Sequence, residues 1–194
     1  MNLVDRVKRI LLSPQLEWEV IDGEATTPGA LYIGYILPLA AIGPIATVIG
    51  YSVFGIRVPF SGTVYRVPIG SAITSAIVTY VLTLVGVYVL SLIIDALAPT
   101  FGGTKSPIQA LKVATYSTTA AWVSGIFAIM PGLRMLGLLG LYSVYLLYLG
   151  LPVLMKAAKD RAVAYTVLIL VVEFVLMVVI GLVGSRFTGM QPAM

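Results

Sequence analysis

Five long apolar runs dominate the chain, and short segments that contain charge, proline or glycine separate them. Each run is close to or above the roughly 20 residues that an α-helix needs to cross about 30 Å of hydrocarbon. The pattern therefore predicts an all-α membrane protein whose transmembrane domain, residues 30–184, is a five-transmembrane-helix bundle. The predicted spans cover residues 30–54, 69–94, 108–130, 133–155 and 163–184. The third and fourth runs are separated only by Pro131 and Gly132. A break this short predicts a tight antiparallel hairpin of two helices.

Residues 1–29 have a different pattern, in which apolar and charged positions interleave at helical spacing. The apolar positions are Leu3, Val7, Ile10 and Leu11, and the charged positions between them are Asp5, Arg6, Lys8 and Arg9. This pattern is typical of a short amphipathic helix at the cytoplasmic membrane interface. Ser13 and Pro14 predict the N-cap and first residue of a second short helix, in which Trp18 suits an interfacial anchor. An equally open interpretation is that this segment packs beneath the bundle.

The basic residues predict the orientation of the bundle. If the N-terminus is inside, eight Lys and Arg residues lie in the inside segments and four in the outside segments. Because basic residues concentrate on the cytoplasmic side of membrane proteins, we expect a cytoplasmic N-terminus and an external C-terminus. The inside group includes the loop at 156–161, and the outside group includes the loop at 57–66. Residues 185–194 are then a short external C-terminal tail.

The composition supports an integral membrane protein. Hydrophobic residues make up 59% of the chain and charged residues 10%, and the mean hydropathy is +1.03. A soluble domain carries about 25% charged residues, so this chain lacks the charge to cover a water-facing surface. The formal net charge of +4 is better explained by membrane orientation than by nucleic-acid binding.

The residue types also argue against an enzyme. The chain has no cysteine and no histidine, which removes the usual ligands of zinc, copper, haem and iron–sulfur clusters. It also removes Cys/His and Ser/His/Asp catalysis. The segment from Gly102 to Ser106 contains glycines followed by Lys105, but it lacks the full phosphate-loop pattern and a preceding strand. We therefore expect no cofactor and no nucleotide hydrolysis.

Asp95 lies at the end of the second run, before a proline and a glycine pair. An acid at the C-terminus of a helix opposes the helix dipole, so capping of its own helix does not explain Asp95. Lys105 and Lys112 follow near the same predicted face. We expect Asp95 to pair with one of them and to clasp neighbouring helices. The alternative is a site for a cation or a partner protein at the cytoplasmic face.

Glu173 lies near the middle of the fifth run, where a charged carboxyl costs several kcal/mol. No Lys or Arg lies at matching depth in another run, so we expect a neutral carboxyl held by hydroxyl groups. The candidate partners are Thr79, Thr83, Tyr88, Thr118, Thr119, Tyr142, Tyr145 and Tyr148. The alternative is a place on a proton or cation pathway, because intramembrane acids often mark such pathways.

Small residues repeat every four positions in the second run, at Ser71, Ser75 and Thr79. This spacing puts them on one face of a helix. In membranes, small residues let two helix backbones approach closely. The repeat therefore predicts a close helix–helix contact.

Several stretches together resemble bacterial members of the Yip (Ypt-interacting protein) family of integral membrane proteins. They are "RVKRILLSPQLEWEVI", "LIIDALAPTFGGTKSPIQALKVATYSTTAAWVSGI", and "LYSVYLLYLGLPVLMK" followed by "DRAVAYTV". The resemblance covers nearly the whole chain. It implies five transmembrane helices, a cytoplasmic N-terminus and an external or lumenal C-terminus.

Eukaryotic relatives in that family resemble membrane-trafficking factors that engage Rab GTPases and carry an Asp-Leu-x-Gly-Pro motif. In this chain only Asp95 and Pro99 stand at matching spacing. No binding role is carried over on that basis. The resemblance and the composition together predict a non-enzymatic, multi-pass protein of a bacterial inner membrane.

The expected function is that of a membrane-organising or partner-binding adaptor. Its expected partners are the lipid bilayer and either another membrane protein or further copies of itself as a homo-oligomer. Nucleic acid is not expected. The alternative function is a small transporter or channel that uses Glu173 and Asp95.

Overall fold

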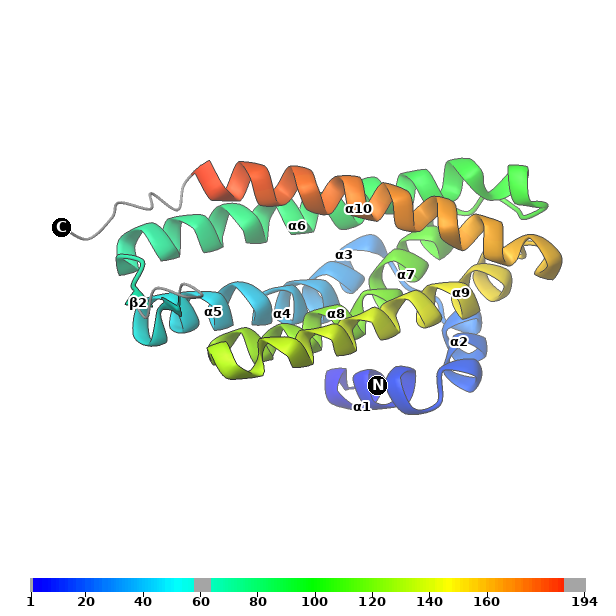
Figure 1. The fold of residues 1–194 in the computed structure, drawn as a ribbon. Coiled ribbons are helices and arrows are strands. Elements are labelled where there is room, and N and C mark those ends of the chain that lie inside the picture. Colours follow the sequence, from blue (N-terminus) through cyan, green and yellow to red (C-terminus); the bar gives the residue numbers. More distant parts are fainter. Residues whose placement is uncertain (1, 58–63, 187–194) are drawn as a thin grey trace.

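The computed structural model describes residues 2–57 and 64–186, and within them almost every element is helical. The predicted tail at 185–194 and the tip of the predicted loop at 57–66 lie largely outside the described residues. The chain passes back and forth along one long axis, and α1 and α2 lie beside this bundle (Figure 1). The all-helical class predicted from the apolar runs is therefore confirmed, apart from two very short strands.

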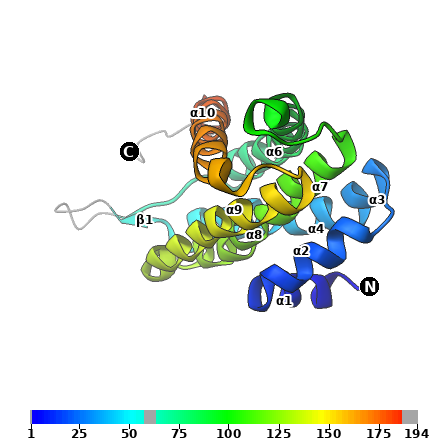
Figure 2. The ribbon, with the colours of Figure 1, turned by 90° about the vertical axis from the view of Figure 1, so that its right-hand side faces the viewer.

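The N-terminal segment forms two helices, α1 (Leu3–Leu12) and α2 (Pro14–Gly23). Asn2 caps α1, because its side-chain oxygen accepts the backbone N–H of Asp5 at 2.9 Å. Ser13 and Pro14 start α2 as the sequence predicts, since proline at the first helical position loses no intrahelical hydrogen bond. The end-on view shows both helices packed along one side of the bundle (Figure 2).

The first passage along the bundle is helical but irregular. It consists of α3 (Pro28–Leu31), the π-helical turn η1 (Tyr32–Ile36), α4 (Leu37–Ala40), α5 (Ile42–Ile49) and a second π-helical turn η2 (Gly50–Phe54). Pro38 and Pro44 lack a backbone N–H, so the helical hydrogen-bond ladder cannot run through them unbroken. The π-turns lie on either side of this proline-containing stretch, as expected where a ladder is disturbed.

The second passage is the long helix α6 (Ile69–Leu97), which ends in the 3₁₀ turn η3 (Ala98–Phe101). Before it, β1 (Ile56–Arg57) pairs antiparallel with β2 (Val64–Tyr65). Gly102 then adopts a left-handed conformation, with φ of 75°, which reverses the chain after η3.

The third passage is broken. It consists of α7 (Pro107–Ser117), α8 (Thr119–Ser124) and the 3₁₀ turn η4 (Gly125–Ile129). At the break, the Thr118 hydroxyl donates to the carbonyls of Ala114 and Thr115, and the Thr119 hydroxyl donates to that of Tyr116. Such side-chain competition for backbone carbonyls bends helices.

The fourth and fifth passages complete the bundle. They comprise the 3₁₀ segment η5 (Pro131–Leu141), α9 (Tyr142–Leu154), the short turn η6 (Lys159–Arg161) and α10 (Ala162–Arg186). The turn between η4 and η5 lies at Met130, directly before Pro131 and Gly132, where the hairpin is predicted. Helices α6 and α10 run side by side in both views (Figures 1 and 2).

Among the described residues, four segments are long and apolar enough to cross a membrane: Pro28–Phe54, Ile69–Phe101, Gly132–Leu154 and Lys159–Val183. They correspond to the first, second, fourth and fifth predicted spans. The predicted third span, 108–130, also passes along the bundle but is divided at Thr118 into pieces that are too short. The five-span count is therefore not confirmed.

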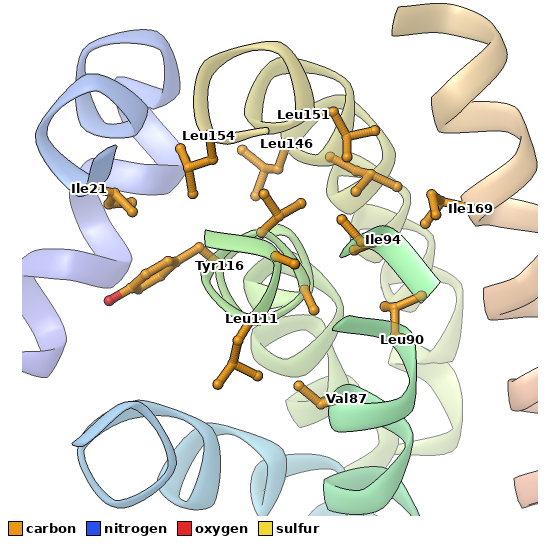
Figure 3. Close-up of a cluster of buried hydrophobic side chains, with 14 of the residues drawn as sticks. Ile21, Val87, Leu90, Ile94, Leu111, Tyr116, Leu146, Leu151, Leu154 and Ile169 are labelled. Carbon is orange, nitrogen blue, oxygen red and sulfur yellow. The ribbon is translucent and has the colours of Figure 1, made fainter. Parts of the chain in front are cut away.

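The core lies where α2, α6, α7, α9 and α10 converge. Figure 3 shows Ile21 from α2 and Tyr116 from α7 facing Leu146 and Leu154 from α9, with Ile169 from α10 at the far side. Because α2 contributes fully buried side chains to this cluster, the N-terminal helices are part of the folded core.

The segments that follow α6 and α9 meet at one end of the bundle, which we call the junction end. The Thr104 N–H donates to the carbonyl of Met155 at 2.8 Å, and the Ala158 N–H donates to that of Phe101 at 3.1 Å. Two of the segments predicted to lie inside the cell therefore meet at this end, and Lys156 connects them to Asp22 at the end of α2. The strands and the turn at Met130 lie at the opposite end (Figure 1).

Candidate functional site

Arg6 is the centre of a buried ion-pair cluster between α1 and α2. Its Nη1 donates to Oε1 of Glu17 at 2.5 Å, and its Nη2 donates to both carboxylate oxygens of Glu24. Arg6 is only 6% exposed and Glu17 only 3%. Charges buried to this degree are tolerated only when they are paired and hydrogen-bonded, so the cluster fixes α1 against α2.

Tyr116 of α7 extends this cluster into the bundle. The Arg6 guanidinium lies over its ring, 5.5 Å from the centroid, in a cation–π contact. Burial opposes the charge on Arg6, but the hydrogen bond to Glu24 and the nearby Tyr116 and Glu17 groups outweigh it and raise the pKa of Arg6. The guanidinium therefore remains charged.

Lys112 of α7 caps the C-terminus of α2. Its Nζ donates to the backbone carbonyls of Ile21 at 2.8 Å and Glu24 at 2.6 Å. The last carbonyls of a helix lack intrahelical partners and carry the negative end of the helix dipole, so an ammonium group is favoured there. Lys112 is 2% exposed and thus performs this role from within the protein.

Asp22 makes a third connection at the end of α2. Its carboxylate accepts a 2.6 Å hydrogen bond from Nζ of Lys156, which follows α9. The Gln109 amide of α7 donates to the Asp22 carbonyl and to Oδ1, at 3.2 and 3.1 Å. Lys156 has a φ of 55°, an unusual value for a residue other than glycine, and the ion pair helps to offset that cost. We call Arg6, Glu17, Asp22, Glu24 and Lys112 the junction cluster.

Trp18 packs the N-terminal helices onto α9. It is fully buried, and its ring fills the space beside Gly150, where an added Cβ would lie 2.7 Å from the indole. Tyr116 packs edge-on to the same indole, with 6.3 Å between ring centroids. The interpretation of Trp18 as an interfacial anchor is therefore wrong, and the alternative of a segment packed against the bundle holds.

The predicted clasp between Asp95 and a lysine is not formed. Oδ1 of Asp95 instead accepts the backbone N–H of Ser106 at 2.6 Å. Ser106 is the N-cap residue of α7, so Asp95 places its negative charge at the start of the next helix, where the dipole favours an anion. Lys112 is engaged with α2, and Lys105 is exposed without an ion pair among the described residues.

Glu173 lies apart from the junction cluster, half-buried on the face of α10 that also carries Ile169 and Leu176. Within the described residues no hydrogen bond or ion pair reaches its carboxyl. Several predicted hydroxyl partners bond elsewhere: Thr83 donates to the Thr79 carbonyl, and Thr118 and Thr119 donate within α7. The expected hydroxyl cradle is therefore absent from this part of the chain.

The sequence contained a signal for the junction cluster. Leu3, Arg6 and Ile10 are spaced by three and four residues, as are Pro14, Glu17 and Ile21. Each charge thus lies on the stripe of its helix that faces the core, and a charged residue on such a stripe requires a buried partner.

The chain matches the family model described as Yip1 domain over residues 8–180. No curated protein and no solved structure matches it. The matched range includes the second half of α1, all of α2 and almost all of the bundle. The chain therefore belongs to the Yip1 domain family.

Proposed function

We propose that this Yip family protein is a non-enzymatic adaptor of a bacterial inner membrane that binds a partner protein through α1 and α2. The observation that carries the proposal is the exposure of Leu12 and Leu16, at 80% and 68%, on helices that are anchored to the bundle. Val4 and Val20 are also exposed on these helices. We call these four side chains the N-terminal surface. Large apolar side chains that remain exposed on an ordered surface are typical of protein-binding sites.

The charges around the N-terminal surface support a protein partner rather than the bilayer. Asp5 and Glu19 are exposed on the same helices as Lys8 and Arg9. A helix that lies on an anionic membrane carries mainly basic residues on its polar face, because acids are repelled by the headgroups. Interleaved acids and bases instead suit complementary charges on a protein.

We place the N-terminal surface in the cytoplasm. The support is the excess of basic residues, eight against four, in the segments that gather with α2 at the junction end. A partner would then approach from the cytoplasm. It would contact helices that the junction cluster fixes to the bundle. This arrangement suits an adaptor that holds another protein at the membrane.

The alternative function, a small transporter or channel that uses Glu173 and Asp95, has less support. Asp95 is engaged by the backbone of Ser106. Two cavities lie beside α6, and neither has Asp95 or Glu173 in its lining. Conducting pathways usually bring several polar groups together, and these two acids lie apart.

Copurification with quantitative mass spectrometry tests the proposal. The full chain is isolated in mild detergent as wild type, as the double variant Leu12→Ser and Leu16→Ser, and as the control Gln15→Ser. Gln15 is exposed between the two leucines, so the control alters the same helix boundary without removing apolar surface. We expect a specific protein to be lost severalfold from the double variant and retained by the control. Equal recovery with all three proteins, at unchanged thermal stability, would contradict the proposal.

A further inference from the structure

A cavity of about 260 Å³ lies between α5, α6 and α8, within the membrane-spanning part of the bundle. Its walls are formed largely by small residues, among them Ala40, Gly43, Ala72, Ala76 and Ala121. Ser75 and Thr79, whose spacing predicts a close helix contact, line this cavity instead. The small side chains therefore leave space between the helices rather than bringing the backbones together.

The cavity cannot close by a simple shift of α5 toward α6, because α5 is held on its other side. A Cβ at Gly125 of η4 would lie 3.0 Å from the Gly43 Cα, and a Cβ at Gly50 would lie 2.2 Å from the Ala128 carbonyl oxygen. These distances show that the first passage already touches η4 backbone to backbone. An apolar space of this size forfeits packing contacts unless something fills it.

A basic group, the guanidinium of Arg134, lies over the ring of Tyr51, one of the residues that line the cavity. The ring of Tyr51 lines the cavity, and the guanidinium of Arg134 lies 4.9 Å from the centroid of that ring. Nη2 of Arg134 is buried and has no hydrogen-bond partner among the described residues, and the same holds for the hydroxyl of the adjacent Ser52. A guanidinium with unused donors is well suited to a phosphate group.

The cavity is also close to the hydrocarbon of the bilayer. A second hollow of about 330 Å³ lies on the other side of the α5–α6 contact, and Pro44 and Ala76 line both spaces. The second hollow is bordered by Ile45 and Ile77, which are strongly exposed on candidate membrane spans and thus face lipid. The cavity therefore adjoins, across Pro44 and Ala76, a hollow that faces the hydrocarbon of the bilayer.

We infer that this cavity binds an acyl chain of an anionic phospholipid whose phosphate is held by Arg134 at the Tyr51 end. The apolar cavity would hold the acyl chain, and the guanidinium of Arg134 beside Tyr51 would hold the phosphate of the headgroup. Arg134 lies at the end of the bundle opposite the junction end. The lipid site is thus separate from the N-terminal surface, and it does not depend on the adaptor function.

Trp122 provides a direct reporter, because it lines the cavity, and the only other tryptophan, Trp18, is fully buried beside Gly150. The full chain is reconstituted in phosphatidylcholine vesicles that contain a small fraction of brominated phosphatidylglycerol or, in parallel, brominated phosphatidylcholine. The emission of Trp122 is obtained by subtracting the signal of a Trp122→Phe variant. We expect the phosphatidylglycerol probe to quench Trp122 severalfold more strongly than the phosphatidylcholine probe.

Substitution of the basic group tests the headgroup contact. Arg134→Gln should weaken the binding of brominated phosphatidylglycerol about tenfold, since charge-assisted hydrogen bonds are lost. Arg134→Lys should retain part of the preference, because the charge remains without the forked geometry. Arg66→Gln is the matched control, as Arg66 is exposed near the same end of the bundle. Equal quenching by both probes, or a preference that survives in Arg134→Gln, would overturn the inference.

Filling the cavity tests the acyl-chain contact. Ala72→Leu, or Ala76→Leu if the first variant does not fold, should reduce the quenching of Trp122 by both probes. Ala164→Leu is the matched control, because Ala164 is exposed on α10 and does not line the cavity. Unchanged quenching in the folded cavity variants would overturn the inference, as would an equal loss in the control.

Discussion

The Nζ of Lys112 donates a 2.8 Å hydrogen bond to the backbone carbonyl of Ile21, so a side chain of α7 completes the end of α2. Both residues are almost fully buried. Water therefore cannot replace the ammonium group if it is removed. The docking of the N-terminal helices thus depends on a contact between distant parts of the chain, and this contact is open to direct test.

Lys112→Met should lower the stability by about 1.5–3 kcal/mol, the range for losing a hydrogen bond to a charged group. The carbonyls of Ile21 and Glu24 would lose their donor, while the apolar stem of the side chain would be kept. Thermal unfolding of the purified protein in detergent measures the change. Lys105→Met is the control and should stay within about 0.5 kcal/mol of wild type, because Lys105 is exposed. Similar losses for both variants would contradict the capping role.

Arg6→Met should cost more, about 3–5 kcal/mol, because it leaves the buried Glu17 carboxylate unpaired. A second change, Glu17→Met, should restore much of the stability in the double variant. The remaining partner, Glu24, is partly exposed and can be hydrated. A double-mutant cycle on the free energies of unfolding measures the coupling, and purely additive effects would show that the pair is not coupled.

Asp95→Ala should cost about 1 kcal/mol, the usual value for the loss of a capping side chain. Asp95→Asn should be milder, since the amide oxygen still accepts the Ser106 N–H. Because Asp95 and Lys112 have separate partners, their substitutions should add to within about 0.3–0.5 kcal/mol in the same unfolding assay. A large coupling energy would instead show that Asp95 and Lys112 interact directly, as the sequence predicts.

Glu173→Leu should leave the stability unchanged or raise it, because no described group loses a hydrogen bond and a polar group leaves the membrane interior. Glu173→Gln should also fold. Unfolding in detergent compares the two variants, and a loss of about 1–3 kcal/mol in the leucine variant would reveal a partner for the carboxyl. Proton or cation flux in proteoliposomes, present in the wild type and absent from folded Glu173→Gln, would favour the transporter function.

Reporter fusions test the orientation. A reporter active only in the cytoplasm should work when it is fused at the N-terminus or within the 156–161 loop, and should be silent when fused after α10. A periplasmic reporter should give the opposite pattern. The excess of basic residues at the junction end is the reason for this expectation. Activity of the periplasmic reporter at 156–161 would reverse the assignment.

The apolar runs predict the passages of the bundle well, because the thickness of a bilayer sets the length of a spanning helix. The residue at which a helix begins can be predicted equally well, as the start of α2 at Ser13 and Pro14 shows. The division of the third passage was harder to foresee. Its cause, the two consecutive hydroxyl residues Thr118 and Thr119, is visible in the sequence, but such residues also occur in unbroken membrane helices.

The candidate site was predicted less well, and the reason is the nature of its contacts. The sequence predicts that Asp95 and Lys112 are important, yet both bind backbone groups rather than each other. A backbone carbonyl or N–H is present at almost every residue, so the sequence does not indicate which one a side chain will meet. Arg6 and Glu17, in contrast, pair through side chains, and their positions on apolar stripes could have revealed them.

The capping of α2 has a consequence for the order in which the protein is assembled. The Arg6–Glu17 pair links residues only 11 positions apart, whereas the Lys112–Ile21 contact spans 91 positions. During synthesis α1 and α2 therefore leave the ribosome with their mutual ion pair available but with the end of α2 incomplete. The N-terminal helices can reach their final position only after α7 has been made. Their docking is therefore completed only when more than half of the chain has been synthesised.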